Sequence, residues 1–114
     1  MTFIDSHCHL DRIDHKEHSL DTLLNIAKEA GVTEMLCVSI GLNNWQAMAD
    51  LVAPYENIHL SVGIHPCNVL SEPLPTAENF APLMADPRVI ATGETGLDYH
   101  YGSDSKREQQ EYFI

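Results

Sequence analysis

The sequence predicts an α/β fold in which helices pack against a parallel sheet. Four apolar, β-branched segments are spread along the 114 residues. Their starts lie 32, 24 and 31 residues apart, a spacing that suits repeated strand–helix–strand units of about 30 residues or more. The second segment contains the unbroken apolar run Met-Leu-Cys-Val, which is typical of a strand covered on both faces. The predicted strands are Thr2–Asp5, Glu34–Ile40, Ile58–Ile64 and Val89–Thr92.

Two helices are predicted between the first three strands. Ser19 can cap the first helix, whose leucines form one apolar stripe, and Gly31 ends it. Asn43 can cap the second helix, whose apolar stripe begins at Trp45 and stops before Pro54. Both helices therefore offer an apolar face to the sheet.

The two later helices have weaker or shorter patterns. A third is predicted over Thr76–Ala85, although Pro82 interrupts its interior. Ser105 and Glu108 form a capping box at the start of a fourth. The sequence then stops at apolar residues, with neither a Gly nor a Pro to end the helix. We interpret the chain as the front part of a longer protein; a short, docked C-terminal helix is the alternative.

The charge balance argues against one mode of nucleic-acid binding. The chain has 17 Asp and Glu against 6 Lys and Arg, a formal net charge of -11. It therefore lacks the cations with which a basic face neutralises phosphates along a strand. A phosphate substrate held by metal ions is compatible with this acidic composition, because the ions reverse the local charge. Hydrophobic residues make up 44% of the chain, so we expect a globular core and not long disorder.

The sequence also bears on cellular location. No segment has the features of a signal peptide or the roughly 20 apolar residues of a membrane span. Cys8, Cys37 and Cys67 lack CxxC spacing and indicate reduced thiols. We expect a cytoplasmic protein with no membrane association, and we predict no stable protein partner.

Two histidines follow the first predicted strand. His7 and His9 are two residues apart, so in a strand they share a face, with Cα atoms roughly 7 Å apart. Asp5 would share that face. Two imidazoles so placed can converge on one ion with bonds of about 2.0–2.1 Å. The alternative is a pair of polar residues at a strand end that are solvated or hydrogen-bonded.

Two further candidates lie at the ends of other strands. Glu94 is set among glycines after the fourth strand, where a carboxylate can bridge two cations or can be a solvated turn residue. His65 follows the third strand and can orient a ligand, contact substrate or bond backbone. Ligands bind beyond the carboxyl ends of parallel strands. We therefore predict a metal site at this edge, made by His7, His9 and Glu94 with His65 beside them.

The segment after Glu94 holds three weaker candidates. Asp98, Tyr99 and His100 follow the fourth predicted strand. They can contact substrate or support a ligand, and an exposed polar loop is the alternative.

Four motifs occur along the chain in a fixed order. They read DSHCHLD from Asp5, VGIHP from Val62, GETGLDY from Gly93, and QQ from Gln109 before Phe113. Together, and over nearly the whole chain, they resemble the TatD family of metal-dependent deoxyribonucleases, which lies within the metallo-dependent hydrolase group.

The resemblance implies a (β/α) barrel of the TIM type. A complete barrel takes about 250 residues, so residues 1–114 would supply about the first four βα units, the N-terminal half of a single domain. By resemblance, His7 and His9 bind one divalent metal, and Glu94 bridges two metals as the catalytic carboxylate. The family's two later histidines and late aspartate have no counterpart here.

The leading hypothesis is a TatD-like metal-dependent hydrolase that cleaves DNA phosphodiester bonds with metal-activated water. One alternative is a metallohydrolase of a small ester, lactone or amide, because the same ligands suit several electrophiles. Another is that the isolated chain is an inactive metal-binding fragment. Mixed imidazole and carboxylate ligands suit Zn, Mn, Fe or Co, and Mg is also compatible.

Overall fold

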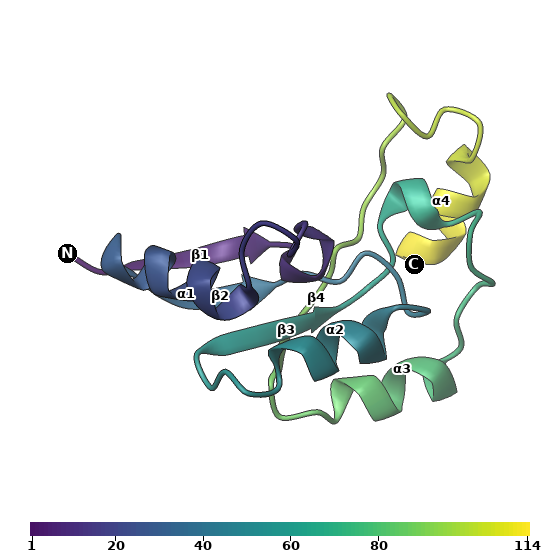
Figure 1. Ribbon diagram of the computed structural model, residues 1–114. Helices are drawn as coiled ribbons and strands as arrows, with labels where there is room; N and C mark the ends of the chain where they lie inside the picture. The colour runs from purple at the N-terminus through teal and green to yellow at the C-terminus, as the bar shows by residue number, and fades with distance from the viewer.

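The computed structural model describes residues 1–114, and one parallel sheet forms its centre (Figure 1). The four strands are hydrogen-bonded in the order β1-β2-β3-β4, which is also their order along the chain. They are β1 (Phe3–Cys8), β2 (Val32–Cys37), β3 (Ile58–Val62) and β4 (Val89–Thr92). Each strand overlaps the segment predicted for it, so the predicted parallel α/β fold is confirmed.

Three strands differ from prediction at their ends. β2 ends at Cys37 and β3 at Val62, short of the predicted Ile40 and Ile64. β1 runs three residues further than predicted, to Cys8. Between the pairs Asp5–Met35 and Cys8–Cys37, β1 contains one more residue than β2. An extra residue of this kind bends a strand and re-aims the side chains that follow it. β2 begins at Val32, two residues early, because pairing with β1 extends over its polar start.

Four α-helices alternate with the strands. They are α1 (Leu20–Glu29), α2 (Trp45–Val52), α3 (Ala77–Met84) and α4 (Lys106–Phe113). Two short 3-10 turns, η1 (Leu10–Arg12) and η2 (Pro66–Asn68), follow β1 and β3. In Figure 1, α1, α2 and α3 lie along the sheet, whereas α4 lies beyond the carboxyl end of β3 and contacts η2.

One face of the sheet carries the hydrophobic core. Trp45 and Met48 of α2 pack against Leu60 of β3, and each of these side chains is at most 3% exposed. The Trp45 indole N–H also donates a hydrogen bond to the Ser61 carbonyl oxygen (2.8 Å). Burying an aliphatic or aromatic side chain of this size contributes roughly 1.5–3 kcal/mol to folding. The core therefore fixes α2 against the centre of the sheet.

The opposite face has no covering helix. Ile4 and Ile90 are 72% and 62% exposed. With strands in sequential order, right-handed crossovers place all connecting helices on the same side of the sheet. This face is therefore uncovered at β1 and β4. The apolar run predicted to be covered on both faces is largely buried, because Met35, Cys37 and Val38 are each at most 6% exposed.

Two predicted helix caps are wrong. The N-cap of α2 is Asn44, which makes no side-chain capping bond; the Glu72 carboxylate instead accepts hydrogen bonds from the backbone N–H groups of Leu42 (2.8 Å) and Asn43 (3.2 Å). Ser105 is buried and makes no capping bond at the start of α4. Its hydroxyl donates to the Gly102 carbonyl oxygen (3.3 Å). Glu72 thus holds the loop before α2 and Ser105 the loop before α4, and neither bond caps an N–H group of the helix itself.

The other two helix starts agree with the sequence. Ser19 Oγ accepts a hydrogen bond from the Thr22 N–H (3.2 Å) at the start of α1. Thr76 and Asn79 form a capping box for α3, which retains Pro82 in its interior. The cap satisfies backbone groups at the start of the helix, whereas Pro82 removes one interior hydrogen bond.

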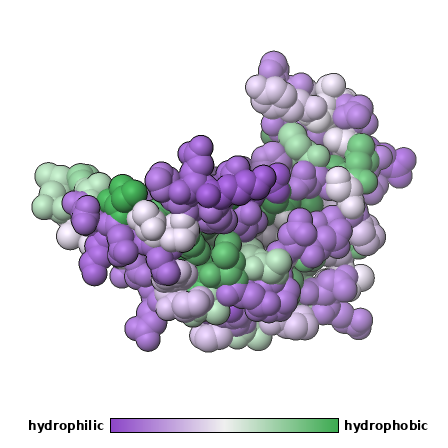
Figure 2. Space-filling view, viewed as in Figure 1, coloured by the Kyte–Doolittle hydropathy of each residue, from purple (hydrophilic) through white to green (hydrophobic).

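The face shown in Figure 2 is mainly hydrophilic, with apolar side chains at the N-terminal end of β1 and in smaller areas toward the middle and the opposite end. Met1 and Phe3, at the N-terminal end, are both more than half exposed. None of the helices has both the length and the apolar character needed to cross a membrane. All three cysteines are free thiols.

Candidate metal centre

Three predicted side chains converge beyond the carboxyl ends of β1 and β4. Nε2 of His7 lies 3.3 Å from Glu94 Oε2, and Nε2 of His9 lies 3.7 Å from the same oxygen. The potential ligand atoms of the three residues all lie within 4.8 Å of one another. Two ligand atoms on one tetrahedral ion with bonds of about 2.0–2.1 Å are about 3.3 Å apart. The spacing therefore fits a shared divalent ion after small movements.

His9 presents an unprotonated nitrogen to this point. Its Nδ1 lies 2.9 Å from the carbonyl oxygen of Val38. A carbonyl oxygen only accepts hydrogen bonds, so Nδ1 carries the proton and donates it. Nε2, which faces Glu94, then keeps its lone pair. Metal-binding histidines are oriented in this way, by a hydrogen bond from the second ring nitrogen.

His65 has the opposite arrangement. The backbone N–H of Cys67 donates to His65 Nδ1 (3.0 Å), so that nitrogen is unprotonated and the neutral ring carries its proton on Nε2. Nε2 lies 3.4 Å from Glu94 Oε1. His65 thus points an N–H group at the carboxylate, on the oxygen that faces away from His7 and His9. This geometry suits a residue that orients Glu94 better than it suits a ligand.

Hydrogen bonds with β3 and with the segment after β2 hold the backbone at Gly93 and Glu94. Its N–H donates to the Ser39 carbonyl oxygen (2.7 Å). The Ser61 hydroxyl donates to the Gly93 carbonyl oxygen (2.6 Å) and accepts from the Ser39 N–H (3.0 Å). A Cβ at Gly63 would lie 2.5 Å from the Gly93 carbonyl carbon. Only glycine at position 63 permits this close approach, which carries the carboxylate to the histidines.

The side chains surround an open hollow of about 330 Å³. Sequence reasoning missed half of its lining residues, although Ile40 ends a predicted strand and the other three lie within three residues of His9 or His65. The eight residues are His7, His9, Arg12, Ile40, His65, Cys67, Asn68 and Glu94.

The other candidates do not line this hollow, although the thiol of Cys67, which does, donates to the Asp98 carboxylate (3.7 Å). The Asp98 carboxylate accepts hydrogen bonds from the N–H groups of Tyr101 and His100, and these bonds hold the pKa of Asp98 below its ordinary value. The Tyr99 hydroxyl accepts from the Gln110 amide (2.8 Å), and the His100 ring packs edge-on against Tyr101. These residues shape the loop that leads to α4.

Asp5 also has a different role from the predicted one. Its carboxylate accepts a hydrogen bond from the His7 N–H (3.0 Å), at the point where β1 has its extra residue. The prediction that Asp5 shares a face with both histidines rested on strict alternation, which the extra residue interrupts.

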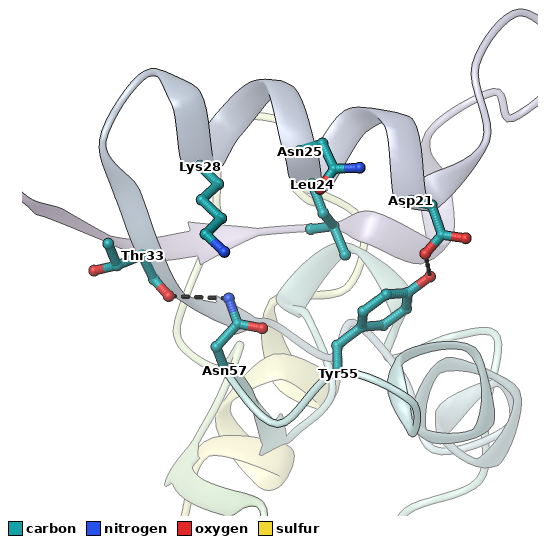
Figure 3. A pocket seen from close by; sticks show the side chains of 7 residues that line it. All are labelled: Asp21, Leu24, Asn25, Lys28, Thr33, Tyr55 and Asn57. Atoms are coloured by element: carbon teal, nitrogen blue, oxygen red, sulfur yellow. Dashed lines mark hydrogen bonds between the residues drawn. The ribbon is translucent and has the colours of Figure 1, made fainter.

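A second hollow, of about 320 Å³, lies between α1 and the loop before β3 (Figure 3). The Tyr55 hydroxyl donates to Asp21 across it (2.5 Å), and the Asn57 amide donates to the Thr33 carbonyl oxygen (2.9 Å). The Asp21 bond raises the pKa of Tyr55. No histidine or cysteine lines this hollow, so the ligand cluster at Glu94 is the candidate site.

Comparisons with known proteins agree with this geometry. The family model described as TatD related DNase matches residues 4–114. An Escherichia coli protein named as the uncharacterized metal-dependent hydrolase YcfH is 39% identical, over 100% of this chain and 43% of its own length. The Escherichia coli 3'-5' ssDNA/RNA exonuclease TatD is 30% identical, over 82% of this chain and 36% of its own.

A solved structure extends the likeness to the fold. The crystal structure of YjjV, a TatD homologue from Escherichia coli, matches with a TM-score of 0.84 and 26% identity. The match covers 97% of this chain and 43% of that chain. The four-stranded sheet is therefore a partial TIM barrel, and the chain spans less than half the length of the relatives it matches.

Proposed function

The chain belongs to the TatD related DNase family, and from this premise we propose that it supplies the N-terminal half of a single-domain, metal-dependent deoxyribonuclease. Two observations support the narrower part of this proposal, phosphodiester cleavage. One is the 3'-5' exonuclease activity on single-stranded DNA and RNA for which the TatD relative is named. The other is an open, shallow site, which a polymer strand can reach without being threaded into a closed cavity.

His7, His9 and Glu94 hold a divalent ion in this proposal. The observation that carries it is the convergence of three ligand atoms within 4.8 Å, with the His9 lone pair already turned toward that point. Two imidazoles and a carboxylate suit Zn, Mn, Fe or Co, and Mg is compatible. Once bound, such an ion supplies a water of lowered pKa and neutralises phosphate charge.

Glu94 has the central place among these residues. Its Oε2 faces the two histidines, whereas its Oε1 faces His65. In this proposal one oxygen would serve the first ion, and the other would be available to a second ion. His65 Nε2, 3.4 Å from Oε1, would help to orient the carboxylate. Glu94 would thus be the carboxylate that the two ions share in the complete site.

Nucleic acid is the partner that this proposal requires, and the cytoplasm is the proposed location. Three free thiols, one of them the fully buried Cys37, support a reducing compartment.

The test measures metal content and hydrolysis together. We expect the purified protein to contain a divalent metal and to cleave a single-stranded oligonucleotide, and we expect His7→Ala/His9→Ala to lose both properties. His59→Ala is the matched control, because His59 pairs with Glu34 at the other end of the strands (2.7 Å). Cleavage of small esters, lactones or amides without cleavage of DNA would replace the nuclease proposal, and metal binding without hydrolysis would contradict both enzymatic functions.

A further inference from the structure

Arg12 brings a cationic side chain to the rim of the candidate metal centre. It ends η1, three residues after His9, and it lines the same hollow as His7, His9 and Glu94. Its backbone N–H donates to the His9 carbonyl oxygen (3.0 Å). The turn is anchored by Leu10, which is 4% exposed. The backbone that carries Arg12 is therefore fixed relative to the ligands.

The Arg12 guanidinium has no carboxylate partner. No carboxylate oxygen lies within 4.0 Å of it, although the chain carries 17 acidic residues. The other two arginines are paired, Arg88 with Asp86 (2.7 Å) and Arg107 with Glu111 (3.1 Å). The adjacent carboxylate of Asp11 lies instead near the Cys37 thiol (4.0 Å).

An unpaired arginine beside a metal site is suited to an anion. The guanidinium carries a permanent charge and a planar set of donors that match phosphate oxygens in pairs. Arg12 is the only Lys or Arg that lines the hollow. In a protein of net charge -11, it gives the site a fixed positive charge that does not depend on the metal.

We propose that Arg12 binds a phosphate of the nucleic-acid strand next to the metal ligands and so sets the path of the strand into the site. The inference rests on the proposed nuclease function and deepens it by assigning a binding residue. Arg12 acts in strand binding, whereas the three ligands hold the ion.

The test is strand binding in the absence of cleavage. The metal-loaded protein is titrated with a fluorescent, hydrolysis-resistant phosphorothioate single strand, and the dissociation constant is followed by anisotropy over a range of salt concentrations. We expect Arg12→Ala and Arg12→Gln to raise the dissociation constant tenfold or more. One lost phosphate contact lowers the slope of log affinity against log salt by about 0.7 for a single strand.

Matched variants separate this role from general charge and from folding. Arg12→Lys keeps the charge without the paired donors, and an intermediate affinity is expected. Lys28→Ala removes one cation from the hollow beside α1 and is expected to leave affinity unchanged. Metal content and melting temperature should match the wild type in every variant. An Arg12→Ala affinity within twofold of wild type, or an equal loss in Lys28→Ala, overturns the inference.

Cleavage measured in parallel distinguishes the two proposals. A wild-type protein that binds the strand through Arg12 but cleaves no DNA supports the inference and contradicts the proposed function. A protein that cleaves DNA with an unchanged KM in Arg12→Ala supports the function and contradicts the inference. A protein that neither binds nor cleaves contradicts both.

Discussion

His9 and His65 face the same carboxylate, that of Glu94, with protons on opposite ring nitrogens. His9 donates from Nδ1 to Val38 and leaves Nε2 free, whereas His65 accepts at Nδ1 from Cys67 and carries its proton on Nε2. Backbone groups alone thereby give the two rings different donor and acceptor atoms at one site. In the proposed site, this difference makes His9 the metal ligand and His65 the residue that orients Glu94.

The two histidines should respond differently to substitution. His9→Ala is expected to lose bound metal because it removes a lone pair directed at the ion, whereas His65→Ala should keep most of the metal and lose hydrolytic rate. Loss of an outer hydrogen-bond partner typically costs 10–100-fold in affinity or activity. Metal content by mass spectrometry, measured beside kcat, checks the split. Equal loss of metal in both variants would contradict the assignment of tautomers.

Gly63 should tolerate no side chain. A Cβ there would lie 2.5 Å from the Gly93 carbonyl carbon, so Gly63→Ala must push the Glu94 segment away from the histidines. Forcing extra atoms into such a contact costs typically 1–3 kcal/mol. We expect a loss of this size in urea unfolding, together with weaker metal binding. Gly93→Ala is the control, because its Cβ would meet no atom closer than 4.0 Å.

Asp86 should make stability depend on pH in the acid range. Paired hydrogen bonds from the Arg88 guanidinium hold the pKa of Asp86 below its ordinary value. The folded state therefore binds the proton less readily than the unfolded state, so the stabilisation is complete above the unfolded pKa, near 3.9, and is lost as pH falls through the lower folded pKa.

Asp86→Asn tests this dependence. Urea unfolding should show a loss of about 1 kcal/mol at pH 7, as for a well-oriented surface pair, and almost no loss at the lowest pH where the protein folds. Glu111→Gln, which breaks the exposed pair with Arg107, should cost less than about 0.5 kcal/mol at either pH. A difference for Asp86→Asn that stays constant with pH would contradict the ion-pair interpretation.

Gln109 should be essential to the loop that leads to α4. Its fully buried amide accepts from the Asp98 N–H (2.7 Å) and donates to the carbonyl oxygens of Asp98 and Gly102. Gln109→Leu leaves these groups unpaired, and each buried unpaired group lowers the free energy of unfolding by about 1–3 kcal/mol. Thermal unfolding should show a large drop, whereas Gln110→Ala, on the exposed side of the helix, should show a small one.

Much of the fold follows from local patterns in the sequence. The spacing of apolar segments locates all four strands, because a strand–helix unit needs a nearly fixed number of residues. The end of α1 at Gly31 follows from the same kind of local signal, since its φ of 96° is one that glycine adopts without strain. For the same reason, the sequence predicts that four site residues lie at strand ends: His7, His9, His65 and Glu94.

The working details of the site depend on contacts between residues far apart in the chain. Strict alternation predicted the face shared by Asp5 and the histidines, and the extra residue in β1 changed it. The carbonyl of Val38, 29 residues away, decides which ring nitrogen of neutral His9 carries the proton. Such partners leave no periodic signal, because a hydrogen bond across a sheet depends on register and not on sequence spacing.

Arg12 shows the same difference between what local sequence and what long-range contacts determine. The sequence by itself determined a parallel α/β chain with metal-ligating residue types at the carboxyl ends of its strands. Only the tertiary structure decided which nitrogen each histidine offers and which of the three arginines is left without a carboxylate partner. The physical reason is that residue type and periodicity are local properties, whereas lone pairs, protons and unpaired charges are assigned by whatever the folded backbone brings within hydrogen-bonding distance.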